Sequence, residues 1–453
     1  MKKNIFIMWA LTGSSLFLCN CHDFLDAKPY NTLAQPNKIE DLRALLDYEA
    51  EMSSWYPGLG EVASDDFQVD YKGLSSTLPV LQDTYLWRDK GMTDGEWMLA
   101  NKVISISNVV LEGLERVKGG PLNVREQLEG EALFWRGWVF FNLAQIYCPP
   151  FTVLEPSSGL GLVLRTDSDS EIDQGRSTLA ETYRQLLEDL HKSVELLPET
   201  SQFITRPSKL VALAALARVY LTIEDYAKSE EMVDRVMQIT SELLDFNDLD
   251  PTAAIPISMS NNIELFNFAQ SWTVSFLMLE ASTHVDPRLY ERYEDSDLRK
   301  HIFFEENVSG VKFKGSYHGQ PTTAFFGLAQ DEMYLIKAEC LARRSAFKEG
   351  ESYLNTLLNH RYKRGEFSPI SFTDSDALLT RVLLERRKEL IFRGLRWMDL
   401  RRLNRYPERA ITLKRQFNDE PDVFSYLEPQ DLRYTFLFPI EAIDAGGYEQ
   451  NPR

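Results

Sequence analysis

Apolar residues recur at three- and four-residue spacing over most of the chain from residue 97 onward. This period places them on one face of an α-helix, whereas a half-buried strand would show strict alternation. The segments that follow the helical period are Trp97–Val117, Val124–Tyr147, Leu179–Leu197, Lys209–Leu221, Tyr226–Leu244, Ala329–Leu341, Phe347–Tyr362 and Asp376–Leu403. The pattern therefore predicts an all-α protein with little sheet.

Two pairs of these helices share the same order of small and large residues. Tyr220 is followed six residues later by Tyr226 and then by a small residue, and the same order recurs within 337–350. In a tetratricopeptide hairpin, large side chains of one helix fill gaps beside small residues of the next. Any helical hairpin can reuse this spacing, but two copies favour tetratricopeptide-type pairs, which we expect within about 122–245 and 329–403.

The segments between the helices are rich in Pro, Gly, Ser, Asp and aromatic residues and lack a sustained period. They are residues 51–94, 149–177, 247–327 and 404–453. Their composition predicts loops, short strands and small helices. Long connections in a compact chain often carry function, and their Trp and Tyr content argues for order. We therefore expect a helical-hairpin scaffold with large irregular insertions.

The N-terminus has the layout of a secretory signal. Two lysines precede an apolar stretch over residues 5–18, which ends at Cys19-Asn20-Cys21. The stretch is too short for a membrane-spanning helix. A cysteine at its end is typical of a bacterial lipoprotein, so we expect residues 1–20 to be removed and Cys21 to carry the lipid anchor. Lipidation of Cys19, or an ordinary signal peptide with two chance cysteines, are the alternatives.

The cysteines and the charge narrow the range of partners. Besides the lipidated Cys21, only Cys148 and Cys340 remain in the mature chain, too few for a disulfide framework, so a hydrophobic core must supply the stability. Removal of residues 1–20 takes away two lysines and no acids, which changes the formal charge from −19 to −21. This negative field repels phosphate backbones, so nucleic acid is not expected as a partner.

The common signatures of catalysis are absent from the sequence. It contains no zinc-protease motif, nucleophile elbow, phosphate-binding loop or complete dinucleotide fingerprint, and no two of its 6 histidines have the spacing of metal ligands on one helical turn. We expect no enzymatic activity, no cofactor and no metal site. A secreted hydrolase stays open because any acidic chain offers pairs of carboxylates. We interpret the adjacent Asp65 and Asp66 as structural.

The densest charged segment is Glu385–Arg402, with the sequence ERRKELIFRGLRWMDLRR. On a helix, Glu385 would pair with Lys388, while apolar residues of the segment, Trp397 among them, would face the core. Forked guanidinium groups can tie helices to carboxylates and carbonyls of neighbouring loops. We interpret this segment as architectural.

The same segment closely resembles the C-terminal signature of the SusD/RagB family of outer-membrane nutrient-binding lipoproteins. Further stretches resemble this family in the same order along the chain: Cys21–Pro29, Ala63–Asp66, Trp97–Asn108, Glu131–Gly137, Asn262–Phe266, Asp297–Arg299, Asp331–Glu339, Phe438–Ile440 and Gln450–Pro452. Each stretch alone is weak evidence. The ordered set spans essentially the whole mature chain.

The resemblance implies a single SusD-like domain over residues 21–453, with a tetratricopeptide scaffold and a ligand face made by the insertions at about 51–94 and 247–327. It also implies a lipid anchor in the outer membrane, facing the cell exterior, and a partner transporter of the SusC-like, TonB-dependent type. Family members bind glycans or, in one branch, peptides. Asn101 stands where the family pattern has an aromatic residue, so glycan and peptide both stay open, with glycan favoured.

Sugar recognition needs a flat aromatic ring against the apolar face of a pyranose, bordered by amide, carboxylate or guanidinium groups. The candidate ligand-binding residues are Trp55, Tyr56, Tyr71, Tyr85, Trp87, Arg88, Asn101, Trp272 and Tyr317. Each ring can instead fill the core of its own insertion. The cluster Tyr85–Arg88 is favoured because the family often places ligand contacts between the Ser-Asp segment and the following helix.

Overall fold

The computed structural model describes residues 36–89, 95–155, 159–169, 175–274, 282–308, 310–320 and 323–453. Residues 38–453 form one compact unit, and residues 1–37 form a separate one. The predicted signal segment and its Cys21 lie outside the described residues. Within the described ranges, no helix combines the length and the apolar character needed to cross a bilayer.

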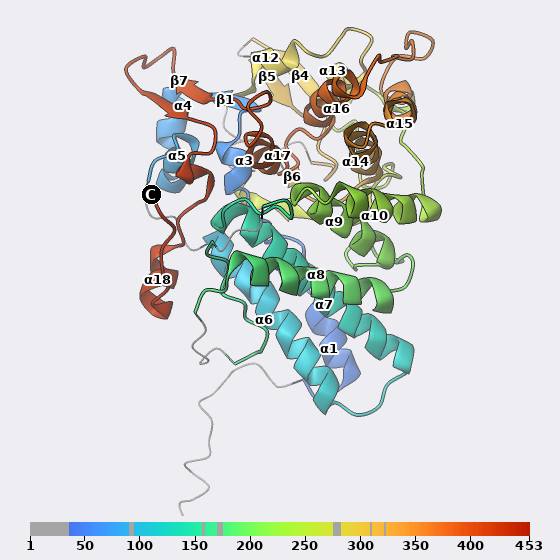
Figure 1. Cartoon of the computed structure of the whole chain (residues 1–453), viewed down its shortest axis with the longest axis vertical. Helices are drawn as coiled ribbons and strands as arrows, with labels where there is room; N and C mark the ends of the chain where they lie inside the picture. Colours follow the sequence, from blue (N-terminus) through green and yellow to red (C-terminus); the bar gives the residue numbers. More distant parts are fainter. Residues whose placement is uncertain are drawn as a thin grey trace, which may run out of the picture. The chain divides into compact units, whose positions relative to one another are not determined.

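The unit 38–453 is built mainly from helices, with a few short strands (Figure 1). The helices are α1 (Ile39–Leu46), α2 (Glu49–Met52), α3 (Leu59–Ala63), α4 (Tyr71–Ser76), α5 (Pro79–Tyr85), α6 (Gly95–Arg116), α7 (Leu122–Tyr147), α8 (Leu179–Leu196), α9 (Lys209–Thr222), α10 (Tyr226–Ile239), α12 (Pro287–Tyr290), α13 (Arg299–Ile302), α14 (Gln330–Arg343), α15 (Phe347–Asn359), α16 (Ser375–Glu389), α17 (Arg396–Leu403) and α18 (Ile440–Gly446). The strands are β1 (Phe67–Val69), β2 (Gln270–Ser271), β3 (Thr283–Val285), β4 (Phe304–Asn307), β5 (Gly310–Phe313), β6 (Ala324–Phe325), β7 (Leu413–Gln416) and β8 (Phe424–Leu427). The predicted helical fold is confirmed.

The strands pair two by two and lie in the predicted insertions. β1 pairs with β3, β2 with β6, β4 with β5, and β7 with β8, each time antiparallel. The pair β1–β3 joins the insertion 51–94 to the insertion 247–327, with Gln68 opposite His284. As predicted, the described parts of the insertions consist of loops, short strands and small helices.

Consecutive long helices pack as pairs, α7 with α8, α9 with α10, and α14 with α15. Figure 1 shows these pairs following one another along the scaffold. Small residues allow the close packing, because a Cβ on Gly137 of α7 would lie 2.9 Å from the carbonyl oxygen of Leu186 in α8. Likewise, a Cβ on Gly350 of α15 would lie 3.1 Å from the carbonyl oxygen of Ala338 in α14. The predicted helical-hairpin scaffold is confirmed.

Two predicted helices were too long. The segment 376–403 is not continuous, because α16 ends at Glu389 and α17 begins at Arg396. Phe392 and Gly394 have φ angles of 57° and 73°, in the left-handed region, so the chain turns between the helices. The second error is at α10, which ends at Ile239, because the following apolar residues pack into the core as extended chain.

The arginines of 385–402 hold elements together, as predicted. Arg387 donates to Asp66 at 2.8 Å, and Arg396 donates to Asp65 at 2.6 Å. Arg402 binds Glu339 of α14 at 2.5 and 2.8 Å. Although burial opposes it, the guanidinium groups of Arg396 and Arg387 hold the pKa of Asp65 below its usual range. The structural interpretation of Asp65 and Asp66 is therefore confirmed.

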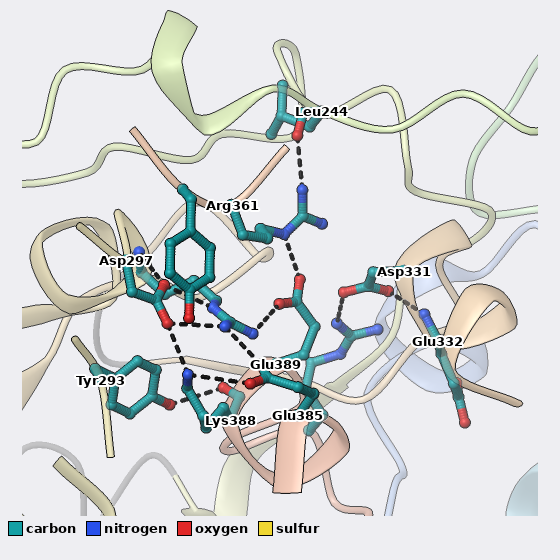
Figure 2. Close-up of polar contacts among 12 residues, drawn as sticks. Leu244, Tyr293, Asp297, Asp331, Glu332, Arg361, Glu385, Lys388 and Glu389 are labelled. Carbon is teal, nitrogen blue, oxygen red and sulfur yellow. Dashed lines mark hydrogen bonds and ion pairs between the residues drawn. The ribbon is translucent and has the colours of Figure 1, made fainter. Parts of the chain in front are cut away.

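Three residues of this segment, Glu385, Lys388 and Glu389, belong to a buried charge network (Figure 2). Arg299 is fully buried and contacts Asp297, Glu385 and Glu389 at 2.8, 2.6 and 2.9 Å. Arg361 is also fully buried and contacts Glu389 at 2.6 Å. The other members of this network are Glu264, 2.8 Å from Arg361, and Lys388, 2.8 Å from Asp297. The network fastens the insertion 247–327 to α16.

Candidate functional site

A cleft of about 470 Å³ opens where three insertions meet, and we call it the insertion cleft. Its lining comes from residues 68–70 and Tyr85, from residues 282–291 with 310–311, and from residues 414–419. Two of these stretches belong to the insertions predicted to form the ligand face. The third surrounds the end of β7 and belongs to the segment 404–453, which was predicted to be irregular but was not assigned to the ligand face.

One wall of the insertion cleft carries a chain of polar side chains. The β1–β3 pairing sets Gln68 opposite His284, and the Gln68 amide donates to Asp286 at 3.1 Å. Asp286 in turn receives two bonds from the Arg288 guanidinium, at 3.1 and 2.7 Å. Although burial opposes it, the bonds from Arg288 hold the pKa of Asp286 below its usual range. Asp286 and Arg288 therefore stay charged and fixed at neutral pH.

The opposite wall is organised by Arg415 of β7. Its guanidinium lies 3.9 Å from the centre of the Tyr85 ring and 4.8 Å from the Trp87 ring. Its Nε donates to the Tyr85 carbonyl at 3.2 Å, and its Nη2 donates to the carbonyls of Ala63 and Ser64. These contacts fix the guanidinium plane beside the cleft.

Two further lining residues have distinct roles. Asp419 accepts the backbone N–H groups of Tyr71 and Lys72 at 2.9 and 3.0 Å, so it holds the start of α4. His284 has a buried Nδ1 without a hydrogen-bond partner among the described residues. Burial, with Lys312 nearby, lowers the pKa of His284, so its imidazole is neutral at pH 7. The cleft thus combines fixed charges with neutral polar groups.

Five of the predicted ligand-binding residues are buried, namely Trp55, Tyr56, Tyr85, Trp87 and Tyr317. Trp55 stacks on Tyr56 at 4.2 Å, the Trp87 indole donates to the Ala63 carbonyl, and the Tyr317 hydroxyl donates to Glu264. In this structure they fill the core of the insertions, which is the alternative stated above. Of the five, only Tyr85 lines the insertion cleft. Their ligand contacts stay a prediction.

The other four predicted residues are more accessible. Tyr71 packs edge-on against Phe417, a lining residue of the insertion cleft, at 5.4 Å. Arg88 is exposed and pairs with Asp83, and the Asn101 amide donates to the Trp97 carbonyl. Trp272 is 53% exposed. The structure therefore gathers Tyr71, Tyr85 and Trp87 around β7, whereas Asn101, Trp272 and Tyr317 lie outside the cleft lining.

The described residues contain no group of three or more His, Cys, Asp or Glu side chains arranged to hold a metal ion. Three of the four carboxylates in the cleft lining already accept bonds from protein donors: Asp70 from the Gly73 N–H, Asp286 from Arg288 and Gln68, and Asp419 from two backbone N–H groups. The site is therefore built for hydrogen bonding by fixed groups.

Comparisons with known proteins place both ends of the chain in one family. A SusD-like family model, described as starch-binding associating with outer membrane, matches residues 23–221. A SusD/RagB model, described as the SusD family, matches residues 302–452. A SusD-like protein P2 of Formosa agariphila is 24% identical, and the similarity covers 70% of this chain and 72% of the relative.

Solved structures share the fold. A putative sugar binding protein from Bacteroides vulgatus has a TM-score of 0.74 at 20% identity, covering 92% of this chain and 99% of its own. A SusD superfamily protein from Bacteroides thetaiotaomicron has a TM-score of 0.75 at 21% identity, covering 92% of this chain and 100% of its own. The fold is thus shared along nearly the whole chain. The two family models, which match residues 23–221 and 302–452, show that this chain belongs to the SusD/RagB family.

Proposed function

We propose that this chain is a cell-surface glycan-binding lipoprotein that captures an oligo- or polysaccharide in the insertion cleft. It then delivers the glycan to a SusC-like, TonB-dependent transporter in the outer membrane. The observation that carries the proposal is the cleft itself, because its volume of about 470 Å³ is lined mostly by hydrogen-bonding side chains. Ligand sites commonly have volumes of about 300–1,000 Å³.

The chemistry of the lining suits a sugar. Gln68, Gln416 and Asn418 offer amides for hydroxyl groups, and the aromatic residues Tyr85, Tyr290 and Phe417 also line the cleft. A saccharide presents many hydroxyls together with small apolar faces, so it needs this mixture. The matching family model is described as starch-binding, and one solved relative is titled a putative sugar binding protein.

Binding without catalysis is favoured by the state of the carboxylates. Glycoside hydrolysis uses two carboxyl groups that are free to act on the substrate. In the insertion cleft, Asp286 and Asp419 have both oxygens occupied by protein donors, which leaves Asp70, bonded through one oxygen to the Gly73 N–H, and Glu291 as the lining carboxylates that a hydrolase could use. Incubation of the protein with a glycan panel tests this directly, and release of shorter products would favour the hydrolase alternative.

The central experiment measures binding of the lipid-free mature chain to a glycan panel and to a peptide mixture by isothermal titration calorimetry. We expect saturable binding to at least one glycan and none to peptides. The variant Gln68→Ala, in the cleft, should weaken binding, whereas Gln238→Ala, an exposed glutamine on α10, should not. Retention of peptides alone would replace the glycan proposal by the peptide alternative.

The anchor and the transporter need separate tests. Replacing Cys21 by alanine should release the protein from membranes, whereas continued acylation of that variant would move the anchor to Cys19. Co-purification from solubilised outer membranes should recover a barrel transporter with the wild-type chain. If a barrel co-purifies and no ligand binds, a purely structural adaptor is the better description.

A further inference from the structure

Two guanidinium groups line the insertion cleft, and each donates hydrogen bonds to the protein through two of its three nitrogen atoms. Arg288 gives its Nε and Nη2 to Asp286, and Arg415 gives its Nε and Nη2 to backbone carbonyls. In both residues Nη1 donates to no group among the described residues. Both residues line the cleft, one from α12 and the other from β7. Each wall therefore carries an anchored guanidinium with an unused donor.

Arg415 also lacks a counter-ion. The side chain belongs to a residue that is only 5% exposed, and no carboxylate of the described residues lies within ion-pair distance of it. Asp65 interacts electrostatically with both Arg415 and Arg288, but its carboxylate oxygens are bonded to Arg396 and Arg387. A nearly buried cation that meets only carbonyls and ring faces is incompletely compensated. An anion at Nη1 would complete it.

The described carboxylates of the cleft accept no hydrogen bond from the Nη1 atoms of Arg288 and Arg415. Asp286 and Asp419 are satisfied by the protein, and Asp70 accepts the Gly73 N–H at 2.6 Å. Glu291 is the lining carboxylate with no bond among the described residues. Guanidinium groups bind carboxylates and sulfates more strongly than neutral hydroxyls, because the bonds are charge-assisted.

We propose that the insertion cleft selects an acidic glycan, whose carboxylate or sulfate ester groups are bound by the Nη1 donors of Arg288 and Arg415. This rests on the proposed function, since it names the class of glycan. It also gives a role to two guanidinium donors that no described residue uses, in a chain whose formal charge is −19. The long-range field of such a chain repels polyanions, so recognition has to come from these local contacts.

The test uses pairs of oligosaccharides that differ only in charge. Calorimetry of the lipid-free mature chain compares galacturonate oligomers with their methyl esters, and sulfated galactan oligomers with their desulfated forms. We expect one acidic member to bind at least about tenfold more tightly than its neutral partner, as the loss of a charge-assisted bond implies. The pair that shows the difference identifies carboxylate or sulfate as the bound group.

Variants assign the effect to the two arginines. Arg288→Gln should lower the affinity for the acidic oligomer about five- to tenfold and leave a neutral one unchanged. Arg364→Gln is the control, because Arg364 is also exposed, pairs with Asp245 and lies outside the cleft, so the net charge changes equally. Arg415→Lys keeps the charge but loses the fork, and should also weaken acidic binding, with thermal melting as a check on folding.

The outcomes separate this inference from the proposed function. Equal or tighter binding of the neutral members, or no binding of any acidic member, overturns the acidic class while glycan binding can still stand. An unchanged acidic affinity in folded Arg288→Gln and Arg415→Lys also overturns it. If peptides bind and neither the acidic nor the neutral oligosaccharides do, the proposed function itself is overturned.

Discussion

The buried charge network and the insertion cleft are both rich in arginine, but they use it differently. In the network, Arg299 meets three carboxylates and Arg361 meets two, and both are fully buried. In the cleft, Arg415 donates to backbone carbonyls and lies against aromatic rings. Arg288 donates to one carboxylate, that of Asp286, through its Nε and Nη2 atoms. In the network every guanidinium nitrogen of Arg299 and Arg361 has a partner, whereas in the cleft the Nη1 groups of Arg288 and Arg415 have none among the described residues.

The difference has an energetic meaning. A buried ion pair contributes little net stability compared with apolar packing, but removal of one partner leaves an uncompensated charge in a low-dielectric interior. The network should therefore be intolerant of single substitutions, whereas the cleft should tolerate them and lose affinity. The predictions below test this contrast.

The largest effect is expected for Arg361→Met. This change leaves Glu389 and Glu264 without their shared cation, so the free energy of unfolding should fall by about 3–5 kcal/mol. The matched control is Arg364→Met, which removes an exposed pair with Asp245 and should leave the free energy of unfolding almost unchanged. Urea denaturation measures both. A loss below about 1 kcal/mol for Arg361→Met would show that the network is not essential to the scaffold.

The turn between α16 and α17 gives the next effect. Gly394 has φ of 73°, and a Cβ there would lie 2.6 Å from a ring carbon of Phe326. Gly394→Ala should therefore lower the free energy of unfolding by about 2–3 kcal/mol, from backbone strain and steric overlap together. Gly447→Ala is the control, because its φ is 61° but its Cβ would meet no atom within 4 Å. Equal losses in urea denaturation would assign the effect to backbone strain alone.

This turn also shows how far the sequence could predict the fold. The helical period identified the long helices because one side of each faces the core, and the arginine density of 385–402 correctly indicated an architectural role. The period continues through Leu390 and Trp397 even though the chain turns between them. Phe392 adopts a left-handed conformation that is uncommon for an aromatic residue, and only tertiary packing can enforce it.

The insertion cleft was less accessible to prediction. Its lining comes from residues 68–70, 282–291 and 414–419, which are far apart in the sequence and lie on strands of three or four residues, on the four-residue helix α12 and on the loops that flank them. Strands this short show no usable alternation. Aromatic content favoured the insertions as the ligand face, which stays a prediction. Composition cannot distinguish a ring that fills a loop core, such as Trp87, from one exposed to solvent, such as Trp272.

A partly buried carboxylate, Glu96, extends the comparison, because it forms no ion pair with any described residue. Glu96 accepts the N–H groups of Gly58 and Leu59 at 2.7 and 3.4 Å. Burial raises the pKa of Glu96 to about 7, despite these bonds and one from Thr273. Because the folded pKa lies above the unfolded value of about 4.3, Glu96 stabilises the fold below that value, and this contribution is lost as the pH rises through 7.

The variant Glu96→Gln keeps a neutral side chain at every pH. We expect its free energy of unfolding to depend less on pH between about 4.3 and 7 than that of the wild type. Glu195→Gln, an exposed position on α8, should keep the wild-type dependence. Urea denaturation at a series of pH values measures both slopes. Identical slopes for Glu96→Gln and the wild type would contradict the assignment.

The smallest effect is expected at Trp272, whose ring is 53% exposed. If this ring stacks on a glycan that extends beyond the insertion cleft, Trp272→Ala should weaken binding about threefold to tenfold. The free energy of unfolding should change by less than about 0.5 kcal/mol, because an exposed ring has little packing to lose. The control is Phe203→Ala, which removes a ring that is 52% exposed and that the sequence did not assign to the ligand face, so the affinity should not change. Unchanged affinity in both variants would confine recognition to the cleft, so that fixed guanidinium groups rather than exposed rings would decide which glycan is bound.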